Sequence, residues 1–91
     1  GGQDFSGQDL AGQSFTNSDL ANANFSNANL QGADFTNTNL SGANFHKANL
    51  KGANLTNSNL AGADLTGANL KGAIKTNINT RGAKTKGTIW R

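Results

Sequence analysis

The chain has 91 residues and a mass of 9.4 kDa, the size of one domain. It carries a formal net charge of +3 and lacks Cys, Met, Pro, Tyr, Val and Glu, whereas Gly occurs 12 times and Asn 15 times. The lack of cysteine excludes a disulfide framework, a thiolate metal site and a thiol nucleophile. No run approaches the roughly 18 apolar residues of a membrane helix, so we expect no membrane span. So restricted a composition indicates an internal repeat.

Large apolar residues recur every five positions along most of the chain. Side chains spaced five residues apart do not lie on the same face of an α-helix, and an odd spacing places successive side chains on opposite faces of a β-strand. The chain must therefore turn at every unit. We predict that the recurring apolar residues form the structural core: Phe5, Leu10, Phe15, Leu20, Phe25, Leu30, Phe35, Leu40, Phe45, Leu50, Leu55, Leu60, Leu65 and Leu70.

Gly or Asn stands two residues after each of these positions, and Lys47 is the one exception. Both residue types tolerate the left-handed backbone conformation that a sharp corner requires. Ala usually stands two residues before the apolar position, as at Ala23 and Ala33, and is small enough to point inward beside it. Each unit thus predicts one straight wall segment and one corner.

A second period of 20 residues aligns Thr16, Thr36, Thr56 and Thr76 in one register. Four units therefore complete one coil. This predicts an all-β fold, a square parallel β-solenoid whose coils lie about 4.8 Å apart. In this register two phenylalanine stacks face each other across the core: Phe5, Phe25 and Phe45 on one wall, and Phe15 and Phe35 on the opposite wall.

The units Ala33 to Asn37 (ADFTN) and Ala48 to Gly52 (ANLKG) resemble the A(D/N)LXX consensus of the pentapeptide-repeat family. The resemblance covers roughly residues 3–73. It implies the family's fold, a right-handed quadrilateral parallel β-helix, here a single domain over residues 1–91 with about 4.5 coils. Proteins similar to this one are numerous in cyanobacteria and occur in the cytoplasm, the periplasm and the thylakoid lumen, so the resemblance is compatible with all three compartments.

The pattern changes after Leu70. Polar residues that make a poor core now hold the apolar positions: Lys75, Thr80 and Thr85. Two isoleucines leave the register: Ile74 and Ile78. We therefore expect residues 74–91 to form a distorted last coil and a C-terminal cap, with Ile89 or Trp90 covering the open end of the core.

Residues that could carry chemistry are few: the chain has one His, five Asp and no Glu, Cys or Tyr. The expected vertical neighbours of His46, Ser26 and Thr66, are weak metal ligands, so we interpret His46 as a solvated surface residue. No calcium-binding Gly-Gly-x-Gly-x-Asp repeat, phosphate-binding glycine loop or nucleophile elbow occurs. The sequence predicts no catalytic residue, no metal site and no cofactor, and we do not expect an enzyme.

The charges are divided along the chain. Residues 1–45 carry a net charge of −4, with no Lys or Arg, whereas residues 46–91 carry +7, with Asp64 as the only acid. We predict a candidate surface for an anionic partner at the basic end, formed by Lys71, Lys75, Arg81, Lys84, Lys86 and Arg91. An alternative interpretation is that these cations deter edge pairing at an open solenoid end. Because the acidic start and the basic end attract each other, we expect either a monomer or weak head-to-tail self-association.

The favoured function is a non-enzymatic structural or protein-interaction module, since short solenoids offer rigid walls for recognition; its partner is unknown. The family resemblance implies an alternative, a DNA mimic that modulates type II topoisomerases, which the short length and positive charge disfavour. A further alternative is weak binding of an anionic partner through the basic end, with nucleic acid disfavoured. Ice binding by the Thr column is a further alternative, but a single column of Thr residues makes a narrow surface for that purpose.

Overall fold

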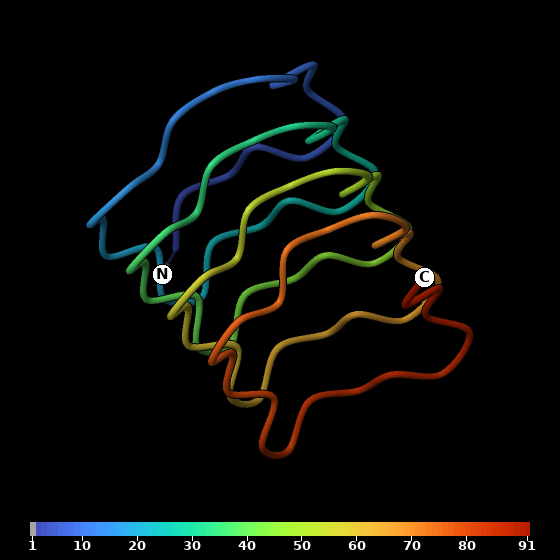
Figure 1. Ribbon diagram of the computed structural model, residues 1–91. Helices are drawn as coiled ribbons and strands as arrows, with labels where there is room; N and C mark the ends of the chain where they lie inside the picture. The colour runs from blue at the N-terminus through green and yellow to red at the C-terminus, as the bar shows by residue number, and fades with distance from the viewer. Residues whose placement is uncertain (1) are drawn as a thin grey trace.

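The five-residue unit determines the backbone of the computed structural model, which describes residues 2–91 (Figure 1). In each unit one extended residue forms a parallel β-bridge, and a two-residue turn follows. Every bridge joins residues 20 positions apart, from Asp4 with Asn24 to Asn69 with Ile89. The chain therefore winds through about 4.5 stacked coils. This confirms the predicted right-handed quadrilateral parallel β-helix.

Each strand is a single bridged residue, and residues 2–91 contain no longer strand and no helix. The bridged residues are Asp4, Asp9, Ser14, Asp19, Asn24, Asn29, Asp34, Asn39, Asn44, Asn49, Asn54, Asn59, Asp64, Asn69, Ile74, Asn79, Lys84 and Ile89. Hydrogen bonds beside the bridges tie the coils together, since Phe25 N donates to the Asn44 carbonyl at 2.7 Å and Asn44 N donates to the Ala23 carbonyl at 2.9 Å. Over the same residues there is no helix long and apolar enough to cross a membrane.

The corners are two-residue turns whose second residue has a positive φ. In one of them Ala28 N donates to the Phe25 carbonyl at 3.0 Å, and the Asn24 side chain accepts a 2.9 Å hydrogen bond from Ser26 N. Asn and Gly occupy this positive-φ position almost everywhere, as predicted, and Lys47 adopts the same conformation with φ 58°. Local side-chain and backbone hydrogen bonds thus fix each turn.

The square section has four walls, each defined by the residues at its centre. The first wall is centred on Phe5, Phe25, Phe45, Leu65 and Thr85, and the second on Leu10, Leu30, Leu50, Leu70 and Trp90. The third wall is centred on Phe15, Phe35, Leu55 and Lys75, and the fourth on Leu20, Leu40, Leu60 and Thr80. Consecutive walls meet at the positive-φ corners.

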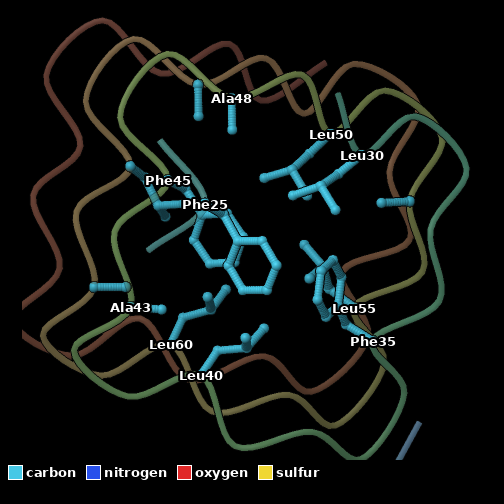
Figure 2. Close-up of a cluster of buried hydrophobic side chains, with 14 of the residues drawn as sticks. Phe25, Leu30, Phe35, Leu40, Ala43, Phe45, Ala48, Leu50, Leu55 and Leu60 are labelled. Atoms are coloured by element: carbon cyan, nitrogen blue, oxygen red, sulfur yellow. The ribbon is translucent and has the colours of Figure 1, made fainter. Parts of the chain in front are cut away.

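Phenylalanine rings fill the core from the first and third walls (Figure 2). The rings of Phe25 and Phe45 stack with centroids 5.1 Å apart, and Phe35 meets Phe25 edge to face at 5.6 Å. From Leu20 to Leu70 the recurring apolar residues are buried. The first coil differs, because no coil covers its outer side among the described residues, and three of its apolar residues are only partly buried against the core: Phe5, Leu10 and Phe15.

The last coil, residues 74–91, keeps the regular backbone instead of the distorted one that we expected. Ile74 and Ile89 form the same bridges as their counterparts in the coils above, and Asn77 has the positive φ of an ordinary corner. The reason is that coil pairing uses backbone groups, as Ile89 N donates to the Ala68 carbonyl at 2.9 Å. A polar residue at the centre of a unit therefore changes the core without changing the fold of the backbone.

Trp90 and Lys75 lie at the C-terminal end of the core. Trp90 sits in the central position of the second wall and packs against the core, whereas Ile89 is 48% exposed. Lys75 is half-buried, and its ammonium donates to the carbonyl oxygens of Trp90 at 2.8 Å and Ala73 at 3.2 Å. Of the two residues expected to cover this end, Trp90 contacts the core, and the role of Lys75 was not expected.

Candidate functional site

Stacking of the coils brings six of the eight cations onto two adjacent walls. Two lie on the first wall, three follow one another in a column of the second wall, and one lies at the corner between these walls. All six are exposed. This group, here called the basic corner, consists of Lys84, Lys86, Lys51, Lys71, Arg91 and Lys47.

The column on the second wall has the spacing of the coils. Gly32 N donates to the Lys51 carbonyl at 2.8 Å, and Gly52 N donates to the Lys71 carbonyl at 3.0 Å, so these backbones lie directly above one another. The stacked phenylalanine rings give that spacing as 4.9 to 5.1 Å. Like charges so close repel one another. The column is therefore suited to an anion that relieves this repulsion.

Asp64 is the only acid in residues 46–91 and forms a bridge with Lys84 on the first wall. Its pKa is lowered chiefly because the Thr66 side chain and the Thr66 N–H, at 2.9 Å, donate to the carboxylate; the charges of His46 and Lys84 contribute less. Asp64 is thus ionised at neutral pH. It offsets one of the positive charges beside it and leaves the basic corner strongly positive.

His46 lies half-exposed on the first wall, and its backbone N–H donates to the Asn44 side chain at 2.9 Å. Its vertical neighbours in the register are Ser26 and Thr66, as the sequence indicated. Over residues 2–91 no three His, Cys, Asp or Glu side chains are grouped so that they could hold a metal ion. The same part of the chain has no surface pocket.

The structure separates the six residues predicted for the anionic-partner surface. Four of them belong to the basic corner: Lys71, Lys84, Lys86 and Arg91. Arg81 is exposed on the fourth wall, away from this group, and Lys75 turns its ammonium toward the end of the core. Lys47 and Lys51 were missed because the charges were compared along the chain. The 20-residue register contained a signal for Lys51, since it stands 20 positions before Lys71.

The acidic residues are interleaved with amides. Asn29 Nδ2 donates to the Asp9 carboxylate at 3.1 Å, and Asn39 Nδ2 donates to the Asp19 carboxylate at 3.2 Å. No two Asp residues form a bridge with each other in residues 2–91. The carboxylates therefore contribute to coil stacking as hydrogen-bond acceptors, and they form no column of regularly spaced negative charge.

The Thr side chains stacked on the third wall and the Asn side chains stacked at its corner form hydrogen bonds mainly with residues of the same wall and corner. The hydroxyl of Thr36 donates to Asp34 at 2.5 Å, and that of Thr56 donates to Asn54 at 2.6 Å. At the adjacent corner, Asn57 Nδ2 donates to Asn37 Oδ1 at 3.1 Å. Because these hydroxyl hydrogens are already engaged, the third wall has few free donors for an external ligand.

Comparison with known proteins places this geometry in a family. The family model described as Pentapeptide repeats (8 copies) matches residues 4–42 and 38–74. A comparison with curated proteins found no match. Among solved structures, a pentapeptide repeat protein from Nostoc PCC 7120 is 31% identical with a TM-score of 0.72, and the match covers 90% of this chain and 84% of that one.

Two further structures are similar over most of the chain. A pentapeptide repeat protein of the Arabidopsis thaliana thylakoid lumen is 34% identical over 91% of this chain, with a TM-score of 0.68. HetL, a Nostoc pentapeptide repeat protein involved in heterocyst differentiation regulation, is 29% identical over 89% of this chain, with a TM-score of 0.70. The match covers 65% of the Arabidopsis protein and 42% of HetL. The chain belongs to the pentapeptide repeat family.

Proposed function

We propose that this protein is a non-enzymatic interaction module whose basic corner binds an acidic segment of a partner protein. The observation that carries the proposal is the gathering of six cations on two adjacent walls. Asp64 is the only acid in this half of the chain. A rigid solenoid holds such a surface in place before binding, which lowers the entropic cost of recognition.

The positions of the aromatic residues favour an acidic protein over a single-stranded nucleic acid. Phe25, Phe35 and Phe45 are fully buried, and Trp90 packs against the end of the core. The outer walls therefore present no row of aromatic rings on which successive bases can stack, since the half-exposed imidazole of His46 is a single ring, and stacking supplies about 1–3 kcal/mol per base in proteins of that kind. Phosphate contacts alone would leave weak, strongly salt-dependent binding.

The charge pattern argues against the DNA-mimic alternative. Mimicry of duplex DNA needs negative charges at regular spacing, whereas Asp9 and Asp19 here accept hydrogen bonds from amides one coil away. The regular charged column of this protein, Lys51 with Lys71 and Arg91, is positive.

A binding experiment with matched variants tests the proposal. The probe is a fluorescently labelled polyglutamate peptide, and its anisotropy is measured against the native chain and two double variants. Lys51→Gln/Lys71→Gln removes two cations from the basic corner, and Lys75→Gln/Arg81→Gln removes two cations outside it. We expect the first variant to bind up to about thirtyfold more weakly, since each of the two exposed ion pairs contributes up to about 1 kcal/mol. The second variant should bind nearly as the native chain does.

Two results would contradict the proposal. Equal weakening by both variants would mean that net charge, and not the basic corner, governs binding. Tighter binding of a labelled single-stranded oligonucleotide than of the peptide at the same ionic strength would favour a nucleic-acid partner. Circular dichroism spectra of the variants control for folding, which matters most for Lys75, since it is half-buried whereas Lys51, Lys71 and Arg81 are exposed.

A further inference from the structure

The cation column of the second wall runs parallel to the axis along which the coils stack (Figure 1). Lys51, Lys71 and Arg91 each follow the central position of their unit by one residue, and all three are exposed. Gln31 holds the same place one coil above Lys51, so the charged part of the column begins at Lys51. The three cations therefore present a straight line of positive charge that has the repeat of the coils.

The repeat of this line distinguishes between the shapes that an acidic segment can adopt. The coils lie 4.9 to 5.1 Å apart, as the stacked phenylalanine rings show, so the first and third cations start about 10 Å apart, twice that spacing. In an α-helix, residues i, i+4 and i+7 share one face and span about 10.5 Å, because the rise is about 1.5 Å per residue. One stripe of a helix therefore supplies a carboxylate for each cation of the column.

An extended acidic segment fits the same line less well. Its side chains alternate between two faces, and those on one face are about 6.7 Å apart, because the rise is roughly 3.3–3.4 Å per residue. Three carboxylates on one face thus span about 13 Å, which is longer than the cation column. A helix therefore forms more ion pairs with this column than an extended chain of the same charge.

The surface beside the column leaves room for a helix, whose diameter is roughly 10–12 Å. On one side the corner residues are glycines. Apart from chain neighbours, no atom lies within 4 Å of the point where a side chain would begin at Gly32 or Gly52. On the other side Asn49 is half-buried, and its side chain folds back to accept a 3.1 Å hydrogen bond from Lys51 N. The column is therefore accessible from both sides.

We propose that the partner segment bound by the basic corner is an acidic α-helix that lies along the second wall, parallel to the solenoid axis. Its carboxylates at i, i+4 and i+7 pair with Lys51, Lys71 and Arg91. This inference rests on the proposed function and specifies the shape of the partner. Backbone hydrogen bonds such as that from Gly52 N to the Lys71 carbonyl, at 3.0 Å, fix the column before binding. The column then selects among acidic segments by the spacing of their charges.

Three labelled peptides of about 20 residues, long enough to form a helix in water, test this shape. All three have the same three Glu residues in a background of Ala and Gln, which favour helix. The matched peptide has Glu at i, i+4 and i+7. The rotated peptide has Glu at i, i+5 and i+10, which distributes the charges around the helix. In the third peptide, Pro replaces a central Ala of the matched sequence and breaks the helix. Circular dichroism verifies the helicity of each peptide.

Binding to the full chain is measured by fluorescence anisotropy at low ionic strength, where exposed ion pairs are least screened. We expect the matched peptide to bind about five- to thirtyfold more tightly than the rotated one, because one or two ion pairs are lost and each contributes up to about fivefold. The Pro peptide should bind as weakly as the rotated one. Lys71→Gln, which interrupts the column, should remove most of the preference for the matched peptide. Lys86→Gln is the matched control, because it removes an exposed cation of the basic corner on the first wall and should keep that preference.

Four results would overturn the inference: equal binding of the matched and rotated peptides, equal binding of the matched and Pro peptides, an undiminished preference in Lys71→Gln, or no measurable binding of the matched peptide. Each of these leaves the proposed function intact if polyglutamate binding still depends on Lys51 and Lys71. If polyglutamate binding does not depend on these two residues, the proposed function is wrong and the inference fails with it.

Discussion

Phe25 and Phe45 lie one coil apart on the first wall with their rings parallel to within 3° and their centroids 5.1 Å apart. Phe35, from the opposite wall, meets both rings edge to face, at 5.6 Å from Phe25 and 5.9 Å from Phe45. Each of the three rings is fully buried. A single aromatic residue in this core therefore couples two walls and two coils.

Phe35→Ala should destabilise the protein strongly, because it leaves a cavity between two aromatic neighbours. Buried Phe→Ala substitutions cost about 3–5 kcal/mol, and in a solenoid this loss affects the interfaces with the adjacent coils. Phe35→Leu is the control and should cost less, since Leu55 fills the same position one coil below. Urea unfolding followed by circular dichroism measures both. Equal losses for Ala and Leu would show that the edge-to-face contacts, and not the filled volume, set the stability.

Ser58 has a buried hydroxyl with no hydrogen-bond partner in the described part of the chain. One coil above, the Thr38 hydroxyl donates to the Phe15 carbonyl at 2.7 Å. Ser58→Ala should raise the free energy of unfolding by about 1 kcal/mol, because leaving a buried polar group unpaired costs about 1–3 kcal/mol. Thr38→Val should lower it by about 0.5–1.5 kcal/mol, since it removes a formed hydrogen bond. Chemical denaturation distinguishes the two, and a loss of stability in Ser58→Ala would contradict the prediction.

The fold could be predicted because two sequence periods assign every residue to a position. The period of five places residues such as Phe25 inside, and the period of 20 decides which residues stack. The regular last coil could not be predicted from side chains. Lys75 and Thr80 are poor core residues, yet the preceding coil fixes their backbone through hydrogen bonds such as that from Ile74 N to Ala53 O at 2.9 Å.

The candidate site could be predicted only in part. Comparing charges along the chain revealed an acidic start and a basic end, but the grouping on two walls follows from the stacking of Lys51 and Lys71. The inward turn of Lys75 depends on two backbone carbonyl oxygens that accept its ammonium, those of Ala73 and Trp90. No local sequence pattern specifies that environment.

Lys47 is a second position where substitution should stabilise the fold. It adopts φ 58° at a corner where the next two coils have Gly67 and Gly87. The left-handed conformation costs a non-glycine residue roughly 1–2 kcal/mol, so Lys47→Gly should raise stability by about 1 kcal/mol. Lys47→Ala is the control, because it removes the same charge but keeps the penalty. The urea midpoint measures both, and an equal gain from Ala would attribute the effect to charge.

Stability should fall in acid because Asp34 is held in its ionised form. The pKa of Asp34 is lowered, first because the Thr36 hydroxyl donates to the carboxylate at 2.5 Å and second because the Thr36 N–H donates at 2.9 Å. A folded-state pKa below the unfolded value of about 3.9 means that the unfolded chain binds the proton more readily. The contribution of Asp34 to the free energy of unfolding is therefore complete at neutral pH. It is lost as the pH falls below about 4 through the folded-state pKa.

Asp34→Asn should remove this part of the acid dependence while keeping the turn. Asn54, one coil below, already accepts the same two bonds from Thr56, at 2.6 Å from the hydroxyl and 3.1 Å from the N–H. Urea midpoints measured from neutral pH down to about pH 3, across the unfolded carboxyl pKa, should thus decline less steeply for Asp34→Asn than for the native chain. Thr36→Val, which removes the hydroxyl donor but leaves the carboxylate, should show an intermediate slope. An unchanged slope in Asp34→Asn would show that the acid sensitivity arises elsewhere, with Asp64 and its Thr66 partner as the next residues to vary.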